Sequence, residues 1–199
     1  MHFITERKKI WKRYGYVVLC ASLLYSVYFL WAAFCPDVKK KELELISMQE
    51  YSGLKVATVR SPAIADNIAG EKSNRMITIY LPPGYKNTND EYPVVYYFPG
   101  LLQTPLHIKK IVPTLNSYFQ AHPENRFIIV SVDIESSCGH SFCRNNPLIG
   151  RWEDFATYEV PQFVEKNFRV YKSRQATGIA GYSGGGNAAL HIGFKKPET

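Results

Sequence analysis

The alternation of hydrophobic and polar side chains predicts a β-sheet in the central part of the chain. Residues 55–60 and 75–81 alternate between the two kinds, as half-buried strands do. Residues 93–98 and 126–132 are almost continuously apolar, which suits strands that are covered on both faces. A fifth strand is predicted over residues 176–180.

Helical patterns lie between the later strands. Residues 152–168 predict an amphipathic helix, which Pro161 is expected to kink or break. Its apolar stripe consists of Phe155, Val160, Phe163, Val164 and Phe168. Residues 187–194 predict a second helix. Two early strands followed by alternating strands and helices predict an α/β fold, with a mostly parallel sheet that has an antiparallel start.

The N-terminal region predicts a membrane segment. Residues 14–35 carry no charge, and a helix of about 20 apolar residues spans the roughly 30 Å hydrocarbon core of a bilayer. Residues 1–13 hold five basic residues and one acidic residue, so the positive-inside rule leaves this tail in the cytoplasm. We therefore expect a single-pass membrane protein with its folded domain on the extracytoplasmic side, periplasmic or extracellular.

Two alternatives to an uncleaved anchor stay open. A cleaved signal peptide has the same basic start and apolar middle, and it would make the protein secreted. Against it, the apolar run is long and no good pair of small residues follows it. Lipidation of Cys35 is the second alternative, although Phe34 before it is large for such processing. All three place the folded domain outside the cytosol.

The sequence between the apolar run and the first predicted strand is polar. Residues 36–50 predict a helical stalk. The expected division of the chain is a basic tail (1–13), a transmembrane anchor or signal (14–35), a stalk (36–52) and a folded domain (53–199).

The net charge does not indicate nucleic-acid binding. The formal net charge is +7, but more than half of it comes from the basic tail, and the other charges are mixed along the chain. We expect no nucleic-acid partner.

Two cysteines in the segment SSCGHSFC suggest a disulfide. In an oxidising compartment Cys138 and Cys143 could close a small loop. A zinc site is the alternative because His140 lies between them, but a structural zinc site needs four ligands and this segment offers three. Two free thiols are the third possibility. We expect no metal.

The strongest chemical signal lies near the C-terminus. Gly181-Tyr182-Ser183-Gly184-Gly185 matches G-x-S-x-G, the nucleophile elbow, between a predicted strand and a predicted helix. Gly181 and Gly185 are needed where neighbouring backbone passes too close for a Cβ. Ser183 then projects from a strained corner toward the positive end of the new helix.

A second loop completes the expected site. Phe98-Pro99-Gly100-Leu101-Leu102 follows the third predicted strand, where a hydrolase of this design takes one N–H of its oxyanion hole. Leu101 is the expected donor there, and Gly184, directly after the serine, is the other.

These motifs resemble the putative esterase family of α/β hydrolases. The runs IYLPPGY, YPVVYYFPGL and IAGYSGGGNAAL occur in the family's order and spacing, over about residues 53–197. That family includes S-formylglutathione hydrolase (esterase D), feruloyl and acetyl-xylan esterases, enterochelin esterases and mycolyltransferases. The resemblance implies that Ser183 is the nucleophile and that the Leu101 and Gly184 amides form the oxyanion hole.

One departure from the family pattern concerns the base. In these hydrolases the acid and the histidine follow the serine, but only His191 and Glu198 do so here. His191 lies eight residues along the same helix, about 12 Å away, so it cannot reach the Ser183 hydroxyl. His107, His122 and His140 precede the serine. We therefore expect a fragment, with a sheet that is incomplete at its C-terminal side.

The resemblance implies a serine carboxylic-ester hydrolase that forms an acyl-enzyme, needs no cofactor, and acts on a small-molecule or glycan-linked ester. An acyltransferase of the same fold and a catalytically inactive, membrane-tethered remnant are the alternatives. The ester, any acceptor and the oligomeric state stay open.

Overall fold

The structure is a computed structural model that describes residues 41–196. The basic tail and the predicted membrane segment lie outside these residues. Within residues 41–196, no helix has the length and the apolar character that crossing a bilayer requires.

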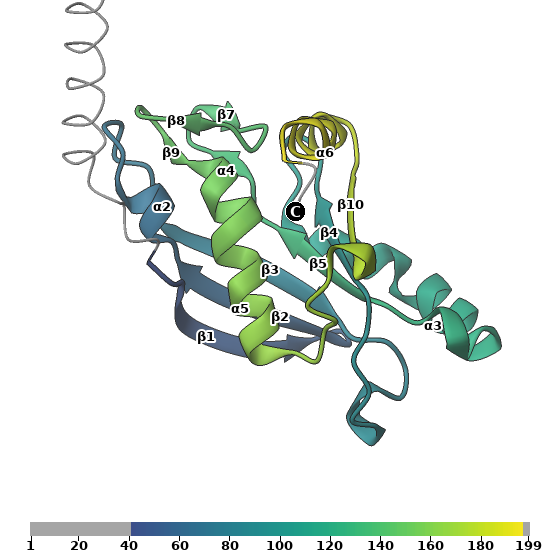
Figure 1. Ribbon diagram of the computed structural model, residues 1–199. Helices are drawn as coiled ribbons and strands as arrows, with labels where there is room; N and C mark the ends of the chain where they lie inside the picture. The colour runs from purple at the N-terminus through teal and green to yellow at the C-terminus, as the bar shows by residue number, and fades with distance from the viewer. Residues whose placement is uncertain (1–40, 197–199) are drawn as a thin grey trace, which may run out of the picture. The chain divides into compact units, whose positions relative to one another are not determined.

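A six-stranded mixed sheet forms the centre of the domain (Figure 1). Its strand order is β1-β2-β3-β5-β4-β10. The strands are β1 (Glu44–Tyr51), β2 (Leu54–Arg60), β3 (Asn74–Tyr80), β4 (Val94–Phe98), β5 (Ile128–Val132) and β10 (Thr177–Gly181). Strands β2 to β5 and β10 lie within two residues of the predicted positions, so the hydrophobic pattern located all five.

The predicted helical stalk is wrong for residues 44–51, which form β1. This strand pairs antiparallel with β2 from Glu44–Arg60 to Tyr51–Leu54. The connecting residues Ser52 and Gly53 both have positive φ, 49° and 75°, as a two-residue hairpin with the twist of the flanking strands requires. Every residue of β1 is exposed, so backbone pairing rather than burial holds it.

The sheet is also less parallel than predicted. The β1–β2, β2–β3 and β3–β5 pairs are antiparallel, and only β5–β4 and β4–β10 are parallel. The antiparallel start is confirmed, and β1 lengthens it. Strand β10 is last in the order, and within residues 41–196 it pairs only with β4.

Side chains on the two faces of the sheet belong to two hydrophobic clusters. In β5, Ile128, Val130 and Val132 join the larger cluster, whereas Ile129 joins the smaller one. The larger cluster includes side chains of α5 (Val160–Asn167) and α6 (Gly184–Lys195), and the smaller includes those of α3 (Val112–Ala121). The sheet is therefore a middle layer between helices, with α4 and α5 crossing it in Figure 1.

The remaining elements are short. They are α2 (Pro62–Ala65), β6 (Glu135–Ser136), β7 (Gly139–His140), β8 (Asn145–Asn146), β9 (Gly150–Arg151), α4 (Trp152–Asp154) and 3₁₀ segments at Tyr85–Asn87, Pro105–Ile111, Pro123–Asn125 and Arg174–Ala176. Strands β6 and β7 form one hairpin, and β8 and β9 form another.

The predicted 152–168 helix changes its hydrogen bonding just before its proline. Helix α4 passes into a π-helical turn at Phe155–Glu159, and α5 follows. The N–H of Val160 donates to the carbonyl of Phe155, five residues back. Pro161 is the second residue of α5, where its missing N–H is tolerated. The interruption expected at the proline is therefore a π-helical turn. Three side chains of the predicted apolar stripe, Phe155, Val160 and Val164, are fully buried.

Candidate active site

Ser183 occupies the corner between β10 and α6. Its φ is 52° and its ψ is −117°, a backbone conformation that is strained for a residue with a side chain. The Tyr182 N–H donates to the Phe98 carbonyl at 3.1 Å, which carries the β4–β10 pairing up to the corner. The predicted strand–turn–helix corner is therefore present, with the serine at its apex.

The hydroxyl of Ser183 is exposed and uncommitted. A serine that begins a helix usually accepts a hydrogen bond from a backbone N–H of the first turn, but Ser183 makes no such cap. Among residues 41–196, no side chain holds its Oγ. Because α6 has 12 residues, its positive end favours negative charge at this position.

Two glycines permit the corner because backbone approaches them closely. A Cβ on Gly185 would lie 1.9 Å from the Phe98 carbonyl oxygen, and a Cβ on Gly181 would lie 2.2 Å from the Gly185 oxygen. Both distances are far below van der Waals contact. The two glycines predicted to flank the serine are therefore sterically required.

The loop after β4 lies directly against this corner. A Cβ on Gly100 would be 3.4 Å from the Ser183 Cβ and 3.2 Å from the Tyr182 carbonyl oxygen. The Gln103 N–H donates to the Gly100 carbonyl at 3.0 Å, and the Gly100 N–H donates to the Gln103 side chain at 3.1 Å. Leu102 completes this tight turn with φ 62°.

The two amides predicted to bind an oxyanion are both available. Within the described part of the chain, the Leu101 N–H has no hydrogen-bond acceptor. Gly184 is the first residue of α6, so its N–H is one of those that a helix leaves unpaired. The structure thus brings together the Leu101 loop, Ser183 and Gly184, while their roles stay predictions.

Three of the four histidines in residues 41–196 contact partners away from the Ser183 hydroxyl. His107 accepts a hydrogen bond from the Thr104 N–H at 3.1 Å, and exposed His122 lies 3.6 Å from Glu124. His191 contacts the Glu153 carboxylate at 3.2 Å. His140 is the exception in position, because it approaches the corner itself.

The sequence suggested His140 only as a ligand of the alternative zinc site and gave it no role at the Ser183 corner. Its Nε2 lies 3.2 Å from the Pro99 carbonyl oxygen, and its ring would be 3.2 Å from a Cβ on Gly184. No local pattern signals this, because the contact joins segments 41 residues apart. The Gly100–Gln103 side-chain contact was also missed.

Glu153 ties α4 to the end of α6. Its carboxylate is buried and receives His191, Lys195 at 2.7 Å and Lys196 at 3.3 Å. Burial alone would raise the pKa of Glu153, but the hydrogen bonds from Lys195, His191 and Lys196 outweigh it and hold the pKa below the ordinary value. This cluster fixes the helix that follows Ser183.

The two cysteines that the sequence offered as a possible disulfide are not bonded to each other in this structure. Cys138 and Cys143 are both free, with Cys138 exposed at the β6–β7 turn and Cys143 completely buried in the larger hydrophobic cluster. Burial raises the pKa of the Cys143 thiol. The two side chains lie in different environments, so closeness in sequence did not pair them. Among residues 41–196 no group of potential ligands could hold a metal ion.

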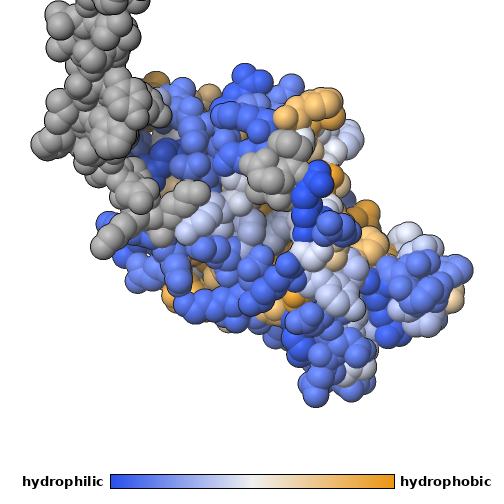
Figure 2. Space-filling model, viewed as in Figure 1, coloured by the Kyte–Doolittle hydropathy of each residue, from blue (hydrophilic) through white to orange (hydrophobic). Residues whose placement is uncertain are grey.

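Two cavities lie near these elements. One, of about 280 Å³, is lined by the Leu102–Gln103 turn together with Asp133 and Glu135. The other, of about 300 Å³, is mostly apolar and lies between α5 and β10, and Ser183 does not line it. Ser183 lines neither cavity, but the first adjoins the loop that lies against Ser183. Apolar side chains, Leu190 and Phe194, are also exposed over α6, where Figure 2 shows a hydrophobic patch.

A family model named Esterase, with the description Putative esterase, matches residues 69–199. The match spans the Gly100 loop, the His140 hairpin and the Ser183 corner. The chain belongs to this esterase family. A search of curated protein sequences gives no significant match.

Solved structures of esterases share the fold. S-formylglutathione hydrolase from Agrobacterium tumefaciens is 22% identical with a TM-score of 0.56, over 78% of this chain and 58% of its own. A ferulic acid esterase from Anaeromyces mucronatus, solved with ferulic acid, is 21% identical with a TM-score of 0.55, over 82% and 60%. A fluorophosphonate-binding serine hydrolase of Staphylococcus aureus is 18% identical with a TM-score of 0.58, over 73% and 52%.

These likenesses establish the α/β-hydrolase fold. The aligned region covers between about half and three fifths of each of these solved chains.

Proposed function

We propose that the protein is a serine carboxylic-ester hydrolase with Ser183 as its nucleophile. The observation that carries the proposal is the conformation of Ser183, φ 52° and ψ −117°, at an exposed corner between a strand and a helix. Such strain persists where a fold holds a residue for chemistry. Membership of the esterase family supports the same reaction class.

In the proposed reaction, the Ser183 oxygen attacks the acyl carbon of an ester while its proton passes to a base. The carbonyl oxygen becomes an oxyanion, which the N–H groups of Leu101 and Gly184 stabilise. Collapse releases the alcohol with the transferred proton and leaves an acyl-enzyme. Water then attacks the acyl carbon, and the carboxylic acid leaves.

We also propose that the activating histidine and acid lie outside residues 41–196. Each described histidine has another partner or lies away from Oγ, and an unactivated hydroxyl is a weak nucleophile at neutral pH. Retention of activity in a variant that combines replacements of His107, His122 and His191 would agree with this. Complete loss from His107 or His191 alone would contradict it.

The substrate class we propose is a small-molecule or glycan-linked ester. A similar solved structure contains ferulic acid, which supports a carboxylic acyl group. The cavity beside Leu102 and Gln103 could receive one side of such an ester.

The experiment measures p-nitrophenyl acetate hydrolysis by the protein at its natural length. A burst of nitrophenol equal to the enzyme concentration is expected if the acyl-enzyme accumulates. Ser183→Ala should remove the burst and lower the rate by about 10⁴-fold or more. Undiminished hydrolysis by Ser183→Ala would refute the proposal. Adding an acceptor alcohol distinguishes acyl transfer, which would give a new ester in place of the free acid.

For the location, we propose that residues 14–35 anchor the protein with its folded domain outside the cytosol. The uncharged run and the basic residues before it support this. Protease added to cells whose plasma membrane is intact, after removal of any outer membrane, should cleave the folded domain. Full protection, with cleavage only after lysis, would contradict the orientation.

A further inference from the structure

The hairpin formed by β6 and β7 brings an unassigned histidine to the corner. The His140 Nε2 lies 3.2 Å from the Pro99 carbonyl oxygen, and the same ring packs against Gly184. A Cβ on Gly184 would lie 3.2 Å from both Cδ2 and Nε2 of His140. One side chain thus contacts both loops that supply the proposed oxyanion amides.

Two hydrogen bonds of the His140 ring indicate which of its nitrogens carries the hydrogen. The Phe142 N–H donates to His140 Nδ1 at 3.1 Å, so Nδ1 carries a lone pair. Because the Pro99 oxygen can only accept, the hydrogen must be on Nε2, which donates to it. Both ring nitrogens are therefore engaged in hydrogen bonds, so His140 is not placed to act as the base.

The orientation of the Pro99 carbonyl affects the position of the Leu101 N–H. This carbonyl belongs to the peptide that precedes Gly100, and its oxygen would be 2.4 Å from a Cβ on Gly185. Rotation of the peptide between Pro99 and Gly100 would change the path of the loop relative to α6. The position of the Leu101 N–H, in the next peptide, would change with it. The donor on His140 holds that peptide in one orientation.

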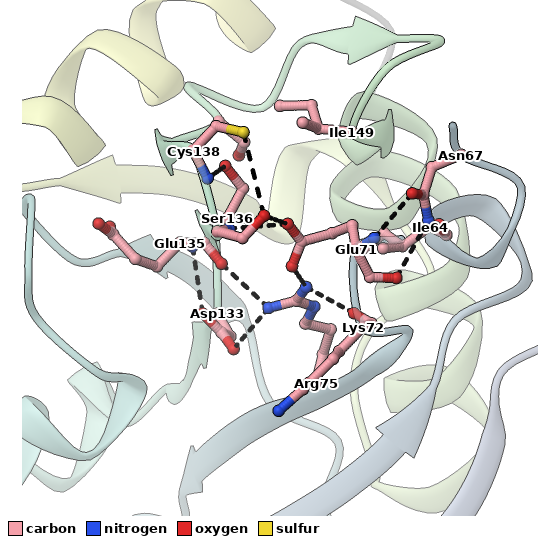
Figure 3. A network of polar contacts seen from close by, with 12 residues as sticks. Ile64, Asn67, Glu71, Lys72, Arg75, Asp133, Glu135, Ser136, Cys138 and Ile149 are labelled. Atoms are coloured by element: carbon pink, nitrogen blue, oxygen red, sulfur yellow. Dashed lines mark hydrogen bonds and ion pairs between the residues drawn. The ribbon is translucent and has the colours of Figure 1, made fainter. Parts of the chain in front are cut away.

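The hairpin is also held by a network of polar contacts, which Figure 3 shows. Arg75 donates to the Glu135 carbonyl at 3.0 Å and forms an ion pair with Glu71. The Glu71 carboxylate accepts from the N–H and the hydroxyl of Ser137, at 2.7 and 2.6 Å.

This network is buried. The Arg75 guanidinium lies 4.5 Å from the centre of the Trp152 ring. Burial would raise the pKa of Glu71, but Ser137 and Arg75 together hold it below the ordinary value, so Glu71 stays ionised. The network thereby ties the β6–β7 hairpin to Arg75 of β3, and His140 of the same hairpin reaches the Pro99 carbonyl at the corner.

We propose that His140 is a positioning residue for the oxyanion hole. Its Nε2–H holds the Pro99 carbonyl, and its ring packs on Gly184, so the Leu101 and Gly184 amides keep the spacing that a tetrahedral oxyanion needs. The inference rests on the proposed function. It predicts that His140 affects the transition state and leaves ground-state binding of the ester unchanged.

The test compares His140→Phe, which keeps a ring but loses both hydrogen bonds, with His140→Gln, which can donate and accept. In p-nitrophenyl acetate hydrolysis by the natural-length protein, His140→Phe should lower kcat about 10- to 100-fold, which is no more than the loss of one oxyanion-hole donor costs. Its KM should stay within about 2-fold of the KM of the unchanged protein. His140→Gln should recover most of kcat. His122→Phe, a change at an exposed histidine, is the control and should leave kcat unchanged.

A chemical rescue guards against a folding defect. In His140→Ala, added imidazole should restore part of kcat, after subtraction of the Ser183→Ala background. N-methylimidazole, which has no N–H to donate, should not. Equal effects of the two compounds would show that packing or general base catalysis, not the Pro99 hydrogen bond, is involved, and would overturn the inference.

The outcomes separate the two proposals. If Ser183→Ala retains activity, the proposed function fails. If Ser183→Ala is inactive while His140→Phe and His140→Ala keep the kcat of the unchanged protein, the function stands and the role of His140 is refuted.

Discussion

Gly185 and the carbonyl of Phe98 touch so closely that no side chain fits between them. A Cβ on Gly185 would lie 1.9 Å from the Phe98 oxygen. This contact presses the start of α6 onto the end of β4 and so forces the chain to turn sharply at Ser183. The strain at the serine therefore follows from helix–strand packing.

A matched pair of glycine substitutions in α6 tests this packing. Gly185→Ala should lower the free energy of unfolding by about 3 kcal/mol or more, because backbone must move. Gly193→Ala meets nothing within 4 Å and should raise it by about 0.5–1 kcal/mol. Urea denaturation measures both. Similar values for the two variants would argue against the close approach.

Replacing the strained serine should stabilise the protein and inactivate it together. Ser183→Gly removes a side chain from a position with φ 52°, and relief of that strain should add about 1 kcal/mol to the free energy of unfolding. Ester hydrolysis should fall to the level of Ser183→Ala. A loss of stability in Ser183→Gly would show that the corner is not strained.

The Glu153 cluster should give a characteristic pH dependence of stability. The folded pKa of Glu153 lies below its ordinary value of 4.5, so its carboxylate stabilises the fold at neutral pH. That contribution should disappear as the pH falls below 4.5 through the folded pKa. Glu153→Gln should cost about 1–3 kcal/mol at pH 7, and less at low pH.

The control for this prediction is Glu124→Gln, because Glu124 is exposed and, among residues 41–196, its ion-pair partner is exposed His122 alone. It should change the free energy of unfolding by less than about 0.5 kcal/mol at any pH. A Glu153→Gln penalty that stays constant from pH 7 to pH 3 would contradict the assigned pKa direction.

The two cysteines beside His140 should differ in reactivity. Cys138 is exposed and should be alkylated by iodoacetamide in the native protein. Cys143 is completely buried and its thiol pKa is raised, so its alkylation should be at least about 100-fold slower until the protein unfolds. Peptide mass spectrometry after labelling separates the two sites. Recovery of a disulfide-linked Cys138–Cys143 peptide pair would support the original sequence prediction instead.

The sequence located the strands and the corner because those signals are local. Strands β2 to β5 match because each has alternating or continuous apolar residues that the core buries. Strand β10 is only half-buried, and its place directly before the Ser183 motif helped to locate it. The G-x-S-x-G spacing likewise encodes a contact within a few residues, the close approach of Gly181 to Gly185.

The failures have a common physical cause, which is dependence on distant partners. Residues 44–51 are exposed along their whole length and include good helix formers such as Glu, Leu and Met. Their strand exists because β2 offers an edge, which no local pattern records. Cys143 is separated from Cys138 by its burial in the core. His140 gains its position from the β6–β7 hairpin, which the distant Arg75–Glu71 network helps to hold.

The site of fluorophosphonate labelling in the natural-length protein tests most directly whether Ser183 is the nucleophile. We expect one adduct, located by mass spectrometry on the Ser183 hydroxyl and absent from Ser183→Ala. An adduct on another residue, or an unmodified Ser183 in a preparation that hydrolyses esters, would contradict it.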